Sequence, residues 1–192
     1  MTFDPGTLAV VLAAGAGRRF HGREHKLAAP LADGSVLHRV LTHVGRAGFD
    51  QVVVITGARR LAELDGDAPA EVVEVHHPGW DAGQATSVQT AIAVARQRGA
   101  NAVVIGLGDQ PGIPTEAWRA VAASTSPIAV ATYDGRRANP VRLAAEVWPL
   151  LPTDGDEGAR IVMRVHPELV EEVPCHGNPG DIDTVEDLDS WN

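Results

Sequence analysis

Residues 8–26 read LAVVLAAGAGRRFHGREHK, and this stretch decides the fold. It begins with a short apolar run, Leu8–Ala13, of the kind that forms a parallel strand buried on both faces of a sheet. Gly15 and Gly17 follow, and the remainder holds four basic residues and one acid. Glycines after a strand let backbone amides turn toward a ligand. The stretch therefore predicts a buried strand followed by an anion-binding loop.

After this loop, short apolar runs alternate with segments whose apolar residues recur at the spacing of a helix. Further strands are predicted at 51–56, 71–75, 102–107, 128–133 and 169–173. Helices are predicted at 35–47, 84–98, 115–123, 144–151, 157–165 and 185–191. This alternation predicts one α/β domain over residues 1–192, with a doubly wound, mostly parallel sheet. Ligands of such sheets bind at the carboxyl ends of the strands, so the loops 15–26 and 108–114 should share one crevice.

Composition narrows the classes of partner. The chain has 192 residues, 44% of them apolar, which is enough for a substantial core. A net charge of −9 argues against binding to long nucleic acid. No apolar run approaches the ~20 residues that cross a bilayer, and the first residues lack a signal peptide's basic start. With a single cysteine, Cys175, we expect a cytoplasmic protein without a nucleic-acid or membrane partner.

Two common nucleotide motifs do not fit the loop. The dinucleotide fingerprint needs a third glycine, but Phe20 stands at that position. The P-loop needs a Gly-Lys pair, and the sequence contains none. A different phosphate-binding loop, or a basic surface turn without function, remains open.

The segment Leu12–Lys26 resembles the signature Leu-Ala-Ala-Gly-x-Gly-x-Arg-Phe/Met-Gly-x-x-Lys of the MobA-like nucleotidyltransferase family. The resemblance implies a nucleotide-diphospho-sugar transferase fold, with Arg19 and Lys26 in contact with the triphosphate and acting in catalysis. It implies nucleotide binding by Leu12, Ala13, Ala14, Gly15, Gly17, Arg19 and Lys26. The sequence differs in two respects: His21 stands between Phe20 and Gly22, and three residues rather than two separate Gly22 from Lys26.

Two acidic motifs lie far downstream. Gly-Asp-Gln-Pro ends a predicted strand, and a carboxylate there can hold Mg²⁺ against nucleotide phosphates. The family carries Gly-Asp-x-Pro at this place, which implies that Asp109 is the catalytic metal ligand; a turn-forming aspartate is the alternative. Residues 181–188, DIDTVEDL, resemble the family's C-terminal motif, with Asp181 as the second candidate ligand and Asp183 as the alternative. Thr184 is a candidate helix cap.

Three further motifs complete the resemblance. His77–Trp80 with the following Gly83–Ser87 resembles a family segment that lies against the nucleotide, which implies roles for Gly83 and Ser87. The acceptor side of the crevice would be formed by Asn139, Asp156 and Arg160. If helical, Asp156 and Arg160 are also spaced for a structural ion pair.

The motifs run in the family's order across residues 8–188 and predict a Mg²⁺-dependent nucleotidyltransferase. The Ala14 form of the loop resembles molybdenum cofactor cytidylyltransferases, the MocA-like enzymes. We therefore expect CMP transfer from CTP, or from another NTP, to a molybdopterin-type acceptor, with a molybdenum hydroxylase receiving the product. The alternatives are a sugar or isoprenoid phosphate acceptor, and a non-catalytic nucleotide-binding chaperone for molybdenum cofactor.

Overall fold

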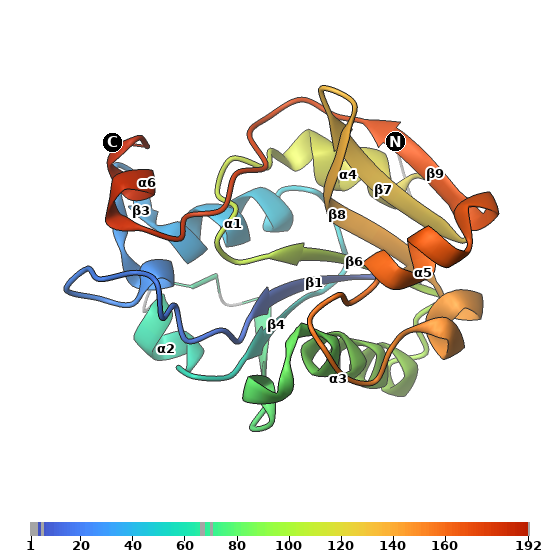
Figure 1. Ribbon diagram of the computed structural model, residues 1–192, viewed down its shortest axis with the longest axis horizontal. Coiled ribbons are helices and arrows are strands. Elements are labelled where there is room, and N and C mark those ends of the chain that lie inside the picture. The colour runs from blue at the N-terminus through green and yellow to red at the C-terminus, as the bar shows by residue number, and fades with distance from the viewer. Residues whose placement is uncertain (1–3, 5, 66–67, 70, 192) are drawn as a thin grey trace.

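A computed structural model describes residues 4, 6–65, 68–69 and 71–191 of the chain. Its centre is a seven-stranded sheet with the order β5-β4-β1-β6-β8-β7-β9 (Figure 1). The strands are β1 (Thr7–Ala13), β4 (Val52–Thr56), β5 (Val72–His76), β6 (Ala102–Leu107), β7 (Ile128–Tyr133), β8 (Arg136–Ala144) and β9 (Val170–Pro174). Neighbouring strands pair in parallel except where β8 takes part. The predicted α/β architecture with a mostly parallel, doubly wound sheet is confirmed.

Helices cover both faces of this sheet (Figure 1). The longer ones are α1 (Val36–Gly45), α3 (Gln84–Gln97), α4 (Thr115–Ala122) and α5 (Arg160–Val165). The remaining elements are η1 (Lys26–Ala28), the β2 and β3 hairpin (Pro30–Leu31, Gly34–Ser35), α2 (Leu61–Leu64), η2 (Trp80–Ala82), η3 (Ala145–Leu150), η4 (Pro167–Leu169) and α6 (Val185–Asp189). In the part of the chain that the structure describes, no helix is both long and apolar enough to cross a membrane.

The position of β1 in the sheet explains why its residues 8–13 are all apolar. Ala9 and Val11 pack into the cluster beneath α1 and α4, which includes the buried Trp118. Leu8, Val10 and Leu12 pack into the cluster beneath α3 and α5. Successive side chains of a strand point to opposite faces, so a strand covered on both sides must be apolar at every position.

The strand β8 is absent from the sequence prediction. It is antiparallel to both β6 and β7, and it follows β7 through a two-residue turn. Asp134 and Gly135 occupy that turn with φ of 49° and 75°. Positive φ at both central residues is typical of the hairpin turn whose twist matches the flanking strands. The hairpin brings Asn139 to the loop after β6, where its Nδ2 donates a hydrogen bond to Gln110 Oε1 at 2.9 Å.

After β9, residues 175–184 run back across the carboxyl ends of the strands to α6; we call them the C-terminal strap (Figure 1, red). Backbone hydrogen bonds fix the strap: Asn178 N–H donates to the Gly112 carbonyl at 3.0 Å, and Ile182 N–H to the Asp109 carbonyl at 2.9 Å. The Ile182 side chain is fully buried. Thr184 then caps α6, as predicted, by accepting a hydrogen bond from the Asp187 N–H. The strap thereby brings late residues of the chain to the loop after β6.

Candidate active site

The predicted anion-binding loop leaves the carboxyl end of β1. Ala58 N–H donates to the Ala14 carbonyl at 3.0 Å, which ties the start of the loop to the segment after β4. Gly17 has a φ of 60° and accepts a hydrogen bond from Phe20 N–H, so the loop turns back toward η1. Below it lies a cavity of about 170 Å³, lined by Leu12, Ala13, Gly15, Gly17, Arg18, Arg19, Lys26, Leu27, Asp109 and Asp183. Most of the residues predicted to bind the triphosphate meet at this cavity.

Lys26 is the centre of the charged groups in this cavity. Its Nζ lies 2.5 Å from Asp109 Oδ2 and 2.9 Å from Asp183 Oδ1. Arg19 pairs with the other Asp183 oxygen at 2.9 Å. Burial by itself would lower the pKa of Lys26, but the charge of Asp109 and the hydrogen bonds to both carboxylates raise it above its usual value. Lys26 therefore stays protonated and ready to pair with an anion.

Two carboxylates beside Lys26 form the part of the site that suits a metal. Asp109 Oδ1 is buried and, within the described part of the chain, has no hydrogen-bond partner. Burial, together with the charge of Asp109, raises the pKa of Asp181. Among the described residues no group of three or more His, Cys, Asp or Glu is arranged to hold a metal. Asp109 and Asp181 could therefore hold a cation only if phosphate or water supplied its other ligands.

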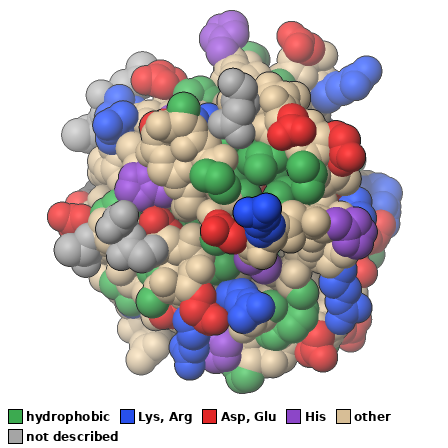
Figure 2. Space-filling view, turned by 90° about the vertical axis from the view of Figure 1, so that its left-hand side faces the viewer, with side chains coloured by type: hydrophobic (Ala, Val, Ile, Leu, Met, Phe, Trp, Pro, Cys, Tyr) green, Lys and Arg blue, Asp and Glu red, His purple; other side chains and the backbone are tan. Residues whose placement is uncertain are grey.

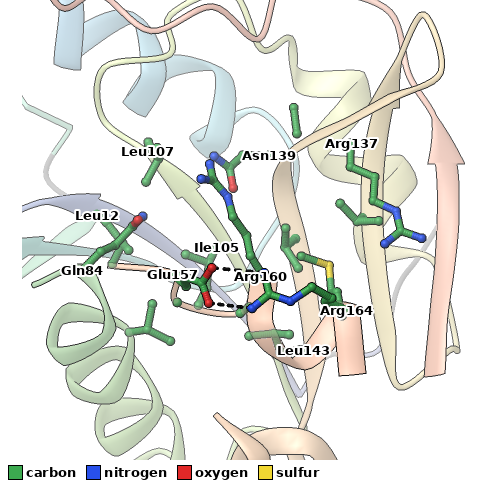
Figure 3. Close-up of a pocket in the computed structure, with 17 residues that line it drawn as sticks. Leu12, Gln84, Ile105, Leu107, Arg137, Asn139, Leu143, Glu157, Arg160 and Arg164 are labelled. Carbon is green, nitrogen blue, oxygen red and sulfur yellow. Dashed lines mark hydrogen bonds and ion pairs between the residues drawn. The ribbon is translucent and has the colours of Figure 1, made fainter. Parts of the chain in front are cut away.

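A second, larger cavity of about 370 Å³ lies on the other side of Leu12, which lines both (Figure 3). Its floor is apolar, with residues such as Ile105, Leu107 and Leu143. Three arginines line its wall. Two of them are in ion pairs: Arg137 pairs with Glu172 at 2.7 Å, and Arg164 pairs with Glu157 at 2.9 Å.

Arg160 is the third of these arginines. Within the described residues no hydrogen bond or ion pair engages its guanidinium. In Figure 3 its side chain extends through the cavity toward Asn139. The cavity therefore combines an apolar floor with one guanidinium available to an anionic group.

Three other predicted residues, Gly83, Ser87 and Asp156, are not among the described residues that line these cavities. Gly83 has a φ of 107°, and a Cβ there would come within 2.7 Å of the Gly155 carbonyl oxygen. Asp156 Oδ1 accepts a hydrogen bond from Gln84 N–H at 3.3 Å, at the start of α3. Because α5 begins only at Arg160, Asp156 and Arg160 do not form the helical ion pair. Ser87 is buried in α3, and the described lining of both cavities includes neither it nor Gly83.

Gln110 is a site residue that the sequence analysis does not single out. Its buried side chain donates from Nε2 to Asp181 Oδ1 at 2.7 Å and to the Pro179 carbonyl at 2.9 Å. Its Oε1 accepts a hydrogen bond from Asn139 Nδ2 at 2.9 Å. Gln110 thus links the larger cavity to the strap. Its place directly after Asp109, at the end of a buried strand, was the available signal.

The surface around the crevice carries both signs of charge. Figure 2 faces the side toward which the carboxyl ends of β1 and β6 point, and it shows basic and acidic side chains interspersed. The basic groups do not merge into one continuous patch on this face. Such a surface favours a small anion held at a defined point rather than a long polyanion.

Known proteins resemble the chain over almost its whole length. It is 29% identical to nicotine blue oxidoreductase from Paenarthrobacter nicotinovorans, over 96% of this chain and 95% of that protein. It is 29% identical to purine catabolism protein PucB from Bacillus subtilis (strain 168), over 97% and 96%. The crystal structure of Rv0371c from Mycobacterium tuberculosis H37Rv superposes with a TM-score of 0.78, at 27% identity over 96% of both chains. Residues 9–172 match the model of the MobA-like NTP transferase domain. The chain therefore belongs to the MobA-like NTP transferase family.

Proposed function

We propose that the protein is a Mg²⁺-dependent nucleotidyltransferase that moves CMP from CTP to a molybdopterin-type acceptor and releases pyrophosphate. The observation that carries the proposal is the convergence of Lys26, Asp109 and Asp183 below the anion-binding loop 15–26, here called the glycine-arginine loop, and beside a second cavity. A cationic loop facing carboxylates suits a nucleoside triphosphate with its metal. An adjoining pocket suits a second substrate.

The residues around Asp109 fit a divalent cation. The buried Asp109 Oδ1 has no hydrogen-bond partner among the described residues, and the neighbouring Asp181 carries like charge. These two carboxylates would hold the ion, with phosphate oxygens and water as its other ligands. When bound, the ion neutralises charge on the phosphate oxygens. Rv0371c, a relative at 26% identity, has been solved in complex with manganese, which supports a divalent metal.

In the proposed reaction, a terminal phosphate oxygen of the acceptor attacks the α-phosphorus of the nucleotide. A new P–O bond forms as the bond to the β-phosphate breaks, and pyrophosphate leaves. The attacking oxygen is already ionised at neutral pH, so the step requires orientation and charge stabilisation but no general base. Lys26 and Arg19 exchange their pairing with Asp109 and Asp183 for pairing with triphosphate oxygens, and they stabilise charge on the leaving group.

The identity of the two substrates rests on separate features. The Leu-Ala-Ala-Gly form of the loop, through Ala14, favours CTP as the donor. The larger cavity favours an acceptor with an apolar or planar body and an anionic group that Arg160 can meet. The product dinucleotide would pass to a molybdenum hydroxylase. The names of the two relatives, an oxidoreductase and a purine catabolism protein, specify neither a nucleotide nor an acceptor.

Replacement of Asp109 tests the metal role. Asp109→Ala should abolish Mg²⁺-dependent pyrophosphate release even at saturating CTP, because the ion loses its first carboxylate. Asp50→Ala, an exposed acid just before the amino end of β4, is the matched control and should keep wild-type turnover. An Asp109→Ala enzyme with wild-type kcat would remove this residue from the metal role.

A panel of four nucleoside triphosphates, with and without molybdopterin, tests the substrates. Pyrophosphate release that does not depend on CTP would refute the choice of donor. Release with a sugar phosphate or an isoprenoid phosphate in place of molybdopterin would support the alternative acceptors. Nucleotide binding without any pyrophosphate release would support the non-catalytic chaperone.

A further inference from the structure

The segment Leu12–Lys26 is two residues longer than the family signature, and the ring of His25 bridges the two ends of its loop. His25 Nε2 lies 3.1 Å from the carbonyl oxygen of Gly15, where the loop begins. His25 Nδ1 lies 3.3 Å from the Leu27 N–H, in the 3₁₀ turn η1 that carries Lys26. One imidazole therefore connects the first glycine of the loop to the turn that presents the lysine.

These two contacts select a single form of the ring. The Gly15 carbonyl can only accept, so Nε2 must carry a proton and donate it. The Leu27 N–H can only donate, so Nδ1 must keep its lone pair and accept. The geometry therefore requires the neutral Nε2–H tautomer of His25, because a proton on Nδ1 would remove the acceptor for Leu27.

The charged groups around His25 also favour the neutral form of its ring. Burial and the positive charges of Lys26 and Arg59 lower the pKa of His25, against the opposing effect of the hydrogen bond to Gly15. Arg23 and Glu24, from the loop itself, line the same surface hollow as His25 and Arg59. Three positive groups and one negative group therefore lie around the ring, which favours its neutral form near pH 7.

The loop also rests directly on this ring. A Cβ built on Gly17 would lie 3.3 Å from His25 Nε2 and 3.2 Å from Lys26 Cγ. Arg18 and Arg19, the next two residues, are exposed to solvent. The backbone from which the two arginines project is thus packed against His25, and a change in the ring would displace both the loop and Lys26.

We propose that His25 is a positioning residue: its neutral Nε2–H ring ties Gly15 to η1, and so holds the glycine-arginine loop and Lys26 in the arrangement that a triphosphate requires. This inference rests on the proposed function, because it assigns His25 to the binding of the donor nucleotide. His25 itself does not contact the reacting atoms. Its effect passes through the loop backbone and through Lys26.

Three substitutions separate the two contacts. His25→Gln keeps an amide N–H that can reach the Gly15 carbonyl. His25→Asn keeps a short acceptor suited to cap η1 but cannot span to Gly15. His25→Ala removes both. His166→Gln is the matched control, since the ring of His166 bonds only to Glu168 within the described residues, away from the loop.

The measurements are CTP affinity by calorimetry with Mg²⁺, and kcat and KM by pyrophosphate release. His25→Asn, which loses one hydrogen bond, should raise both Kd and KM about 5- to 10-fold, and His25→Ala, which loses two, should raise them at least as much; kcat should change less than about 3-fold in both. His25→Gln and the control should stay within about 2-fold of the wild type. The wild-type Kd should rise as the pH falls through the lowered pKa of His25, and this part of the rise should be missing in His25→Gln.

The possible results distinguish this inference from the proposed function. If the wild type binds no nucleoside triphosphate, the proposed function fails and the role of His25 fails with it. If the wild type binds CTP and His25→Ala binds equally well, only the role of His25 is overturned. Equal weakening by His25→Gln and His25→Ala would also overturn it, provided that both keep the wild-type Tm. Nitrogen-15 NMR of the imidazole supplies a test without nucleotide: the Nδ1–H tautomer at pH 7 would refute the proposed tether.

Discussion

Replacing Lys26 with methionine removes one ammonium group while keeping most of the aliphatic stem. This group lies 2.5 Å from Asp109 Oδ2 and 2.9 Å from Asp183 Oδ1, and the side chain is only 12% exposed. The same group is proposed to meet the triphosphate. Lys26→Met should therefore have two separate effects, one on the stability of the protein without nucleotide and one on its affinity for nucleotide.

Hydrogen bonds to charged groups contribute about 1.5–3 kcal/mol each. Loss of the contact to the triphosphate should raise the Kd for CTP about 10- to 100-fold, at 1.4 kcal/mol for each tenfold change. In a measurement without nucleotide, the substitution leaves Asp109 and Asp183 without the cation that they share. An unpaired, partly buried charge costs about 1–3 kcal/mol, which lowers the Tm of a chain of this size by roughly 3–9 °C.

The pH dependence of this stability term has a definite sign. The pKa of Lys26 is raised above its unfolded value of 10.5 in the folded protein. The pairing therefore contributes fully below pH 10.5 and is lost only as the pH rises through the folded value. The difference in Tm between wild type and Lys26→Met should be present at pH 7 and should disappear in strong alkali.

Calorimetric titration with CTP and Mg²⁺, and thermal unfolding without ligands, check both parts. Arg23→Met is the matched control, because Arg23 is an exposed basic residue of the same loop. It should leave the Tm unchanged and the Kd within about 3-fold of wild type. Wild-type affinity for CTP in Lys26→Met would refute the role of Lys26 at the triphosphate. A Tm at or above the wild-type value would refute the stabilising role of the ion pairs.

Two further substitutions test the metal side of the crevice and the core. Burial, and then the charge of Asp109, raises the pKa of Asp181 above its unfolded value of 3.8. The protonated Asp181 carboxyl therefore stabilises the folded protein below pH 3.8, and this contribution is lost as the pH rises through the pKa of the folded state. Asp181→Asn should therefore raise the Tm at pH 7 while it weakens Mn²⁺ binding measured by calorimetry; an unchanged or lower Tm would contradict this account. Trp118 is 1% exposed and packs edge-to-face on Phe49 with ring centroids 6.4 Å apart. Trp118→Ala should cost about 3–5 kcal/mol in urea unfolding, and a loss below about 1 kcal/mol would show that the core adapts to the cavity.

Elements with a local signature could be predicted from the sequence. All seven residues of β1 are buried, and the apolar run at Leu8–Ala13 reflects that directly. In β8, by contrast, Arg136, Arg137 and Pro140 interrupt the pattern that a strand normally shows. The pair Asp134-Gly135 was the one local sign of a hairpin, and its meaning depends on the strand that follows it.

The candidate site also contains one part that could be predicted from a local motif and another part that could not. The loop that contains Arg19 and Lys26 is one continuous segment, so its motif could be read directly. Which downstream acid faces Lys26 depends on the path of the strap, where Asp181 and Asp183 flank the buried Ile182. Asp181 bonds to Gln110, whereas Asp183 pairs with Lys26, 157 residues away in the sequence. No local pattern contains that information.

The C-terminal strap also has a consequence for the order of assembly during synthesis. Lys26 and Asp109, 83 residues apart, lie in the segments that follow the paired strands β1 and β6, and their charges balance. The strap then adds Asp181 and Asp183, and only with these does negative charge outnumber the positive charge of Lys26 and Arg19. A nascent chain that has not yet placed the strap would present phosphate-binding groups without the surplus of carboxylates that attracts a divalent cation. The capacity to hold metal would thus be among the last properties that the growing polypeptide acquires.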